Sequence, residues 1–491
     1  MTYFIVAIIK LLNLKTVLTI INMNSKIPLI LLGAAAISAS SFADTLTYDG
    51  SATGSFYDGS YWGGTVPSET SDIVFDAKAK TTAYDLDATK GMTVNSITDN
   101  SITDRTLGAD QWGKYIKINI GESTFTILED LTLASNHNYA PFAFATDSDG
   151  VGEVVVKGNI ISQIASDGST GEALFGDGKI LKSLTVGGNI ELQGSKLRFH
   201  ALNVNVNGVV NFTGDISNTQ LNLAYGSMSG QSVSISFGGL NGINKEIKFG
   251  GVAASLIENS SITLRFTNSG TSSFSGKFAC DEGGIGTLQN NRYNLVMNGT
   301  STGVQYYEDT GTTFSFDDVT VKSGKLNFYS TIGKSTISLE GGTLSPATVT
   351  GEIAILKAEA INWDNGKISF DLVQDNSASD KIVLSYALSK TSFSGSGGTR
   401  EIELIADPYD IAAWIDESVD GKLTYTLIEY DSTDFKNGDI VFSQIDGINI
   451  DYNFGDTALT VTLSKVPEPA TIAAIFGACA LAMAAFRRRR K

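Results

Sequence analysis

Cysteine, histidine and proline are scarce in this chain of 491 residues, which has two cysteines, two histidines and seven prolines. Cys479 lies in an apolar stretch near the C-terminus, so Cys280 has no partner in the rest of the chain. An internal disulfide is therefore excluded in the part of the chain before the apolar C-terminal stretch. The folded protein must be stabilised by a large core or by a repeated ladder of strands. His137 and His200 are the only imidazole bases available for catalysis.

Positive charge is also in short supply between the two ends. Residues 44–466 contain 27 basic and 51 acidic residues, because three lysines precede them and five cations and one glutamate follow, so their formal charge is near −24. Such a charge repels nucleic acid and anionic lipid and predicts neither as a partner. Solubility alone explains it, and the collection of divalent cations is the alternative.

Long apolar runs are confined to the two ends. Residues 27–37 are apolar, follow the short cationic start at Met23–Lys26, and precede the small-x-small site at Ser41–Ala43. This order predicts a signal peptide cleaved between Ala43 and Asp44. Residues 1–22 form a second apolar segment, so two interpretations stay open: translation starts at Met23, which we favour, or the signal is unusually long.

The C-terminus combines a short motif, an apolar run and a basic tail. Residues 470–486 are uncharged, and these seventeen residues span about 25 Å as a helix, near the lower limit for crossing a bilayer. The sequence predicts a transmembrane helix with a cytoplasmic basic tail; the alternative is a buried C-terminal helix. The motif is Val466, Pro467, Glu468 and Pro469, and the tail is Arg487, Arg488, Arg489, Arg490 and Lys491.

A signal peptide, a polar body, Pro-Glu-Pro, an apolar helix and a basic tail resemble the PEP-CTERM exported proteins of Gram-negative bacteria. In that family the tail is a sorting tag that a membrane-embedded transpeptidase, exosortase, recognises and cuts near the motif. Ala470 and Thr471 follow the motif here, whereas a Ser or Thr directly after the second proline is common. The resemblance covers about 25 residues. It implies an inner-membrane intermediate and then delivery to the cell surface or extracellular matrix, and it implies no biochemical activity.

The body repeats a strand–glycine–strand pattern in which apolar and polar residues alternate. The repeats begin at Val154, Leu184, Val204, Val319 and Ile337. Alternation sends the apolar side chains inward, and Gly or Asn supplies the positive φ that a sharp corner needs. Spacings of 18 to 30 residues suit the rungs of a solenoid. We predict an all-β, elongated, right-handed parallel β-helix; tandem β-sandwiches joined by hairpins are the alternative.

Three stretches resemble the passenger domains of autotransporters: residues 59–75 (the first coil), 319–344 (the repeats) and 363–383 (the terminal coils). This resemblance is loose, and it implies a β-helical surface protein. Boundaries are predicted as an N-terminal β cap over 44–150, rungs over 151–350, a C-terminal β region over 351–466 and the sorting tag over 467–491. Pro408–Glu417 is the only predicted helix inside the body, and Phe454–Leu463 is a predicted closing strand.

Motifs that carry chemistry are weak. Gly299–Gly303 satisfies G-x-S-x-G around Ser301, but a turn precedes it and no helical pattern follows. Asp147, Asp149 and Glu153 resemble a calcium loop without its full ligand set, and calcium is the only cofactor considered. Acidic residues on adjacent rungs cut polysaccharides in some β-helix proteins, but no pair stands out here. The sequence predicts no catalytic, cofactor or metal site.

Two functions follow from these observations. The first is a structural or adhesive protein of the cell surface or matrix, binding matrix polysaccharide with its polar ladders. Aromatic residues that are candidates for stacking on sugars are Tyr57, Tyr61, Trp62, Tyr306 and Tyr307, although packing in the core or cap is the favoured role for them. The second function is a secreted polysaccharide hydrolase or lyase on the same fold.

Overall fold

The computed structural model divides the chain into two units, Met1–Ala43 and Asp44–Lys491. Every described helix and strand belongs to the second unit. The structure describes residues 43–483 apart from 50–52, 77–78, 81–83, 104–115, 135–141, 166–170, 195, 215–219, 224–229, 250–259, 281–290, 312–313, 350–351, 376, 392–397 and 467–476.

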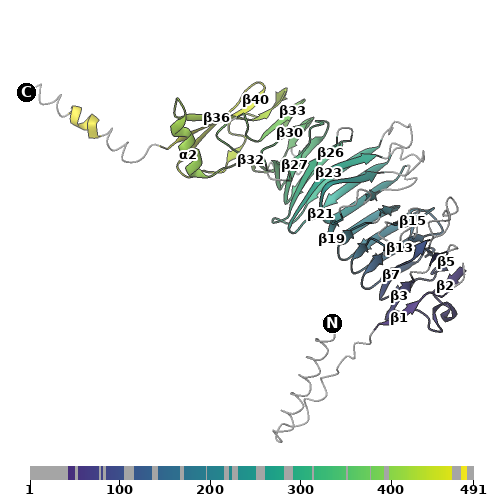
Figure 1. Cartoon of the computed structure of the whole chain (residues 1–491). Coiled ribbons are helices and arrows are strands. Elements are labelled where there is room, and N and C mark those ends of the chain that lie inside the picture. The colour runs from purple at the N-terminus through teal and green to yellow at the C-terminus, as the bar shows by residue number, and fades with distance from the viewer. Residues whose placement is uncertain are drawn as a thin grey trace, which may run out of the picture. The chain divides into compact units, whose positions relative to one another are not determined.

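Parallel strands stack in three columns, and successive turns of the chain add strands to these columns. Figure 1 shows the labels following in chain order from β1 through β19 and β21 to β32. The first column contains β6 (Met92–Val94), β10 (Thr124–Ile127), β13 (Val151–Val156), β16 (Leu181–Val186), the starts of β19 (Ala201–Phe212) and β21 (Ser232–Phe249), β22 (Ser261–Phe266), β24 (Arg292–Asn298), β26 (Asp318–Ser323), β28 (Thr336–Leu339), β31 (Ala360–Trp363), β34 (Ala387–Lys390) and β37 (Ser432–Thr433).

The second column runs beside the first and is the longest. It contains β1 (Asp44–Thr47), β3 (Ser71–Phe75), β7 (Ser96–Asp99), β11 (Leu131–Leu133), β14 (Ile160–Ser162), β17 (Ile190–Leu192), the later parts of β19 and β21, β23 (Thr271–Cys280), β25 (Val304–Asp309), β27 (Lys325–Tyr329), β29 (Thr343–Pro346), β32 (Gly366–Asp371), β35 (Arg400–Ile405) and β38 (Val441–Phe442). β1 and β38 are its two terminal strands.

The third column begins as part of the same sheet and ends as a separate one. Its first part contains β2 (Thr53–Ser55), β5 (Tyr84–Asp87), β9 (Ile116–Asn119), β12 (Phe142–Ala145), β15 (Glu172–Asp177), β18 (Lys196–Phe199), β20 (Gln220–Leu223) and the ends of β21 and β23. Its last part is the five-stranded sheet of β30 (Ile355–Ala358), β33 (Lys381–Leu384), β36 (Lys422–Glu429), β40 (Ala458–Lys465) and β39 (Ile448–Phe454). A short parallel pair, β4 (Ala79–Lys80) with β8 (Ile102–Thr103), lies apart.

The repeats that the sequence suggested stack directly on one another. Val154 is the register partner of Leu184, and Leu184 is the partner of Val204. Val319 pairs with Ile337 in the same way. All five side chains are at most 1% exposed, so they form an apolar column between the walls. The predicted β-helical repeat is therefore confirmed as a stack of parallel strands, consistent with a β-solenoid.

The parallel ladder also decides between the two predicted architectures. Among the described residues, antiparallel strand pairing is confined to β36–β40 and β39–β40, with one isolated bridge between Ile445 and Ile448. Tandem β-sandwiches consist of antiparallel strands, so that alternative is wrong for this part of the chain. The strand ladder is continuous across the predicted boundary at residue 150, because β10 pairs there with β13. Near the next predicted boundary, at residue 351, the separate third-column sheet begins with Ile355.

Close approach, and not positive φ, explains the glycines of the early repeats. Gly158, Gly188 and Gly208 do not have a positive φ, whereas Gly324 and Gly342 have φ of 77° and 61°. A Cβ on Gly188 would lie less than 3.0 Å from Oδ1 of Asn159 on the preceding rung. The predicted role of positive φ is therefore wrong for the first three glycines and right for the last two.

The predictions for the C-terminal region have mixed outcomes. Helix α2 is Pro408–Glu417, as predicted; Asp407 caps it and accepts a hydrogen bond from the Tyr409 backbone N–H. The predicted closing strand 454–463 is wrong in its bounds, because β39 ends at Phe454, a turn follows and β40 begins at Ala458.

Of the predicted helix 470–486 only residues 477–483 are described, and they are helical. No helix in the described part of the chain combines the length and apolar character needed to span a membrane.

Candidate functional site

Ser301 and His200 lie in different parts of the strand order, at a turn and in a wall. Ser301 is exposed in a turn between β24 and β25, where Gly303 N–H donates to Thr300 O over 2.9 Å. A strand follows this turn, whereas a nucleophile elbow requires a helix. His200 is 7% exposed, and its Nδ1 lies 2.9 Å from Gly176 O, so it is a buried residue of the wall. His137 lies outside the described residues.

The carboxylates of the calcium-like loop bond to different residues instead of to one common point. Asp149 accepts a hydrogen bond from Ile180 N–H and lies 3.5 Å from the Lys179 ammonium. Glu153 lies 2.7 Å from the Lys182 ammonium. In the described part of the chain no three His, Cys, Asp or Glu side chains are arranged to hold a metal ion. These contacts join successive rungs.

Two buried carboxyl groups have strongly raised pKa values, but both face backbone. Burial raises the pKa of Asp380 to about 7 and that of Asp309 to about 6. Asp380 accepts hydrogen bonds from Ala354 N–H and Asp371 N–H, and so joins the third column to the second. Asp309 accepts from Gly311 N–H. Their surroundings indicate structural roles.

The predicted sorting residues lie at the two ends of the folded unit. Ala43 closes the first unit and Asp44 opens the second, where it is the first residue of β1. Val466 follows β40, and its N–H donates to Gly447 O over 2.9 Å. Pro467, Glu468 and Pro469 and the tail from Arg487 to Lys491 lie outside the described residues.

A cavity of about 560 Å³ opens beside β1, at the first rung of the solenoid, and we call it the terminal cavity. Its lining comes from β1, the 3-10 helix η2 (Gly59–Trp62), β3 and the start of β5. Among the described strands β1 pairs with β3 alone; Asp44 N–H and Tyr48 N–H donate toward that strand, and no described strand pairs the other side of β1. The described residues that line the cavity are Thr45, Leu46, Thr47, Tyr48, Asp49, Trp62, Gly63, Thr65, Phe75, Asp76 and Tyr84.

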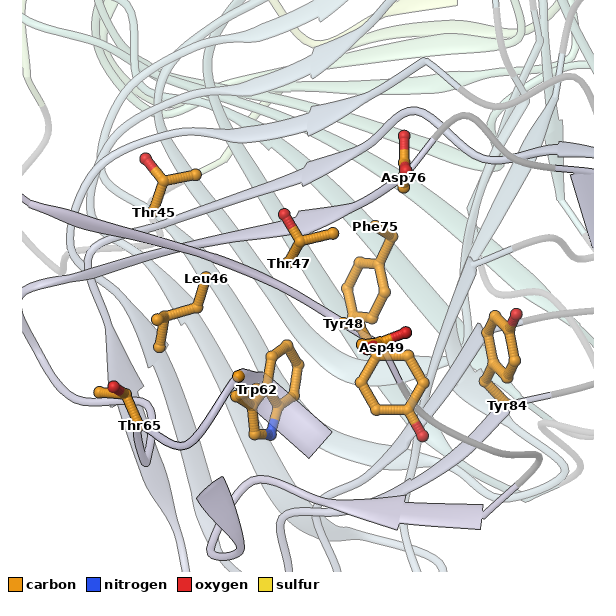
Figure 2. A pocket seen from close by; sticks show the side chains of 11 residues that line it. Thr45, Leu46, Thr47, Tyr48, Asp49, Trp62, Thr65, Phe75, Asp76 and Tyr84 are labelled. Atoms are coloured by element: carbon orange, nitrogen blue, oxygen red, sulfur yellow. The ribbon is translucent and has the colours of Figure 1, made fainter. Parts of the chain in front are cut away.

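Aromatic rings form one wall of the terminal cavity (Figure 2). The ring of Tyr48 lies 5.1 Å from that of Trp62, 5.3 Å from that of Tyr84 and 6.0 Å from that of Phe75. Trp62 is anchored because its indole N–H donates to Ser55 O over 2.9 Å. Burial, followed by the neighbouring Tyr61 and Tyr84, raises the pKa of Tyr48 to about 12, so its hydroxyl is neutral.

Oxygen atoms surround the aromatic wall. The exposed side chains of Thr45, Thr47, Thr65, Asp49 and Asp76 all lie at the cavity, and no lysine or arginine is among the described residues that line it. The cavity therefore combines apolar surface with hydrogen-bond acceptors and negative charge. A cavity of this size and character accommodates a small polar ligand or one unit of a polymer.

A second cavity of about 750 Å³ lies at the other end of the ladder, along β38, β39 and the turn between them. Val441 and Val466 line it and are 50% and 47% exposed. The terminal strand β38 and the edge strand β39 both border this cavity, so each end of the described ladder has a cavity beside an open strand edge.

Sequence reasoning missed the terminal cavity and identified only some of its parts. Trp62 and Tyr307 are 1% exposed, so the favoured packing role is confirmed for them; Tyr57, Tyr61 and Tyr306 are half-buried. The available signal was the density of aromatic residues after Asp44. Residues 46–84 meet only when the first two rungs close, which spacing along the chain does not reveal.

Comparison with protein-family models, with curated proteins and with solved structures finds no match to this chain.

Proposed function

We propose that this protein is an exported structural or adhesive component of the cell surface or extracellular matrix. Its body is an elongated, right-handed β-helix, the hand that parallel crossover connections almost always adopt. The N-terminal signal helix is removed before Asp44. The C-terminal apolar helix crosses the inner membrane until an exosortase-type enzyme cuts near Pro467–Pro469.

The observation that carries this proposal is the unbroken parallel ladder of the second column, from β1 to β38. Each rung buries its apolar face against its neighbours, which makes a durable spacer without disulfides. Polar side chains form a ladder on its outer surface: Asn211 donates to Glu191 over 2.8 Å, and Asn241 donates to Asn211 over 2.8 Å. A regular array of amides and carboxylates suits contact with matrix polysaccharide.

The ends of the folded unit support processing at both sites. The first strand begins at Asp44, so cleavage after Ala43 leaves the ladder intact. The last strand ends at Lys465, and Val466 is the last residue with a described backbone hydrogen bond to the body. Cleavage near the Pro-Glu-Pro motif would remove none of the described strands.

The alternative is a secreted polysaccharide hydrolase or lyase, and it has less support. The carboxyl groups with strongly raised pKa values, Asp309 and Asp380, are at most 3% exposed. The G-x-S-x-G serine has no helix after it. Neither observation provides an acid and a base facing one substrate.

The two functions are separated by incubating the purified protein with a panel of bacterial and algal polysaccharides. Retention on one or more polysaccharides without release of reducing ends or unsaturated products is the expected result. New reducing ends or unsaturated products would replace the structural role with the enzymatic one. Absence of retention on every member of the panel would remove the adhesive role.

A further inference from the structure

The terminal cavity has a recognisable chemical character. Asp49 and Asp76 are exposed at its rim, and the lining includes no described lysine or arginine. The Asp49 side chain makes no hydrogen bond or ion pair with any residue that the structure describes, and its backbone N–H donates to Tyr61 O over 3.0 Å. A ligand that enters here meets the exposed Asp49 carboxylate, which would repel an anionic sugar.

The rest of the lining offers partners for hydroxyl groups and for an apolar ring face. Thr45 and Thr47 present hydroxyls, and their backbone groups lie on the side of β1 that no described strand pairs. The ring of Tyr84 lies beside that of Tyr48 (Figure 2), and Tyr84 is half-buried and lines the cavity, so part of its ring is open to it. Aromatic rings stack on the apolar faces of sugars and also attract ammonium groups.

We propose that the terminal cavity binds a sugar unit that carries an ammonium group, within an amino-sugar polysaccharide. Asp49 receives the ammonium group and Asp76 adds negative charge to the same lining, the threonine hydroxyls and the unpaired side of β1 bind the ring hydroxyls, and Tyr84 covers one face of the ring. This inference rests on the proposed adhesive function and names its ligand class. The formal charge of the body, near −24, draws the same cationic polymer toward the surface.

The test compares oligomers that differ in the group on the sugar nitrogen, which is a charged ammonium in one and a neutral acetamide in the other. Calorimetric titration of the purified protein with a hexamer of glucosamine is set beside titration with the N-acetylated hexamer. The glucosamine hexamer is expected to bind at least about tenfold more tightly, because only its ammonium groups form charge-assisted hydrogen bonds with the carboxylates. Added salt should weaken its binding. Equal affinity for the two hexamers, or no binding of either, overturns the proposal.

Two variants locate the site. Asp49→Asn/Asp76→Asn removes the two rim charges, and Asp420→Asn/Asp451→Asn removes two exposed charges on the turn after α2 and on β39. The first variant is expected to lose at least about tenfold in affinity for the glucosamine hexamer, and the second to keep it. Equal losses would mean that overall charge attracts the oligomer, and the cavity assignment would then be wrong.

A peptide probe excludes the other class of cationic ligand. Hexalysine is expected to bind weakly and with equal affinity to both variants, because it lacks ring hydroxyls. If hexalysine binds as tightly as the glucosamine hexamer and loses affinity with Asp49→Asn/Asp76→Asn, the cavity is a peptide site and the amino-sugar assignment fails. Retention of the rim variant on the polysaccharide panel would leave the adhesive function standing even then.

Discussion

Gln305 shows how single polar side chains stabilise the interior of the stack. It is fully buried, and its Nε2 donates to Leu240 O over 3.0 Å while its Oε1 accepts from Leu240 N–H over 3.1 Å. Leu240 and Gln305 are separated by 65 residues, and Ser272 lies between them in the strand register. One side chain therefore satisfies both backbone groups of a corner residue two rungs away.

Gln305→Met keeps the approximate volume but leaves Leu240 N–H and C=O without a partner. The free energy of unfolding is expected to fall by about 2–4 kcal/mol, because each unsatisfied buried group costs about 1–3 kcal/mol. Urea unfolding followed by circular dichroism measures the change. Gln374→Met is the control, since Gln374 is exposed and its side chain donates to Glu417 on the surface, and it should change stability by less than about 0.5 kcal/mol. Equal effects would show that the interior hydrogen bonds contribute little.

The buried carboxyl groups predict the direction of the pH dependence. Burial raises the pKa of Asp380 to about 7 and that of Asp309 to about 6, from an ordinary value of 3.8. At a pH above 3.8 but below these raised pKa values, the unfolded chain has released both protons while the folded chain still holds them. Stability therefore falls as pH rises through this window and levels off above the folded pKa values.

Thermal melts should accordingly show a higher melting temperature at about pH 5 than at about pH 8. Asp309→Asn keeps an acceptor for Gly311 N–H but does not titrate, so it should reduce this difference. Asp375→Asn is the control, because Asp375 is an exposed residue that accepts from Ser377. A melting temperature that rises between these two pH values would contradict the account.

At the scale of the element, the corner between the first and second columns is fixed by side chains that bond to the next rung. Asp130 Oδ1 accepts from Asn159 N–H, Asn159 Oδ1 accepts from Asn189 N–H, and Asn189 Oδ1 accepts from Val209 N–H, over 2.7, 2.8 and 2.9 Å. The glycine beside each corner leaves room for the side chain of the preceding rung. Glycine and asparagine thus act as a pair at these corners.

Gly188→Ala tests the pair, because the added Cβ would collide with Asn159 Oδ1. The free energy of unfolding is expected to fall by about 2 kcal/mol, as in other overpacked sites. Asn159→Ala should cost about 1–2 kcal/mol through its lost hydrogen bond. The double variant should lose less than the sum of the two, since removing the Asn159 side chain relieves the shortest contact of the added Cβ and leaves the one with Gly158 O. Strict additivity in urea unfolding would show that the contact is unimportant.

At the scale of the whole molecule, local signals predicted more of the fold than of the site. Alternation and glycine spacing identified the strands that stack through Val154, Leu184 and Val204, because each repeat carries its own pattern. The predicted helix Pro408–Glu417 matches α2, and the structure adds that Asp407 caps its first turn. The reason assigned to the early glycines was wrong, since a clash with the preceding rung depends on register and not on local sequence.

The terminal cavity could not be predicted from the sequence for a related reason. Tyr48, Trp62 and Tyr84 belong to three different strands or turns, and only closure of the first rungs brings their rings together. Aromatic density near the N-terminus indicated packing but not a concave surface. The open edge of β1 is likewise a property of the stack, because an edge exists only where the ladder stops.

The central claim is that a folded β-solenoid is exported and released from two sorting signals, and the intact mass of the protein outside producing cells tests it most directly. The account predicts a mass that begins at Asp44 and ends near Pro467. A mass that still includes residues 470–486 and the tail Arg487–Lys491 would make the C-terminal helix a permanent anchor. The surface or matrix role would then be contradicted in favour of a periplasmic one.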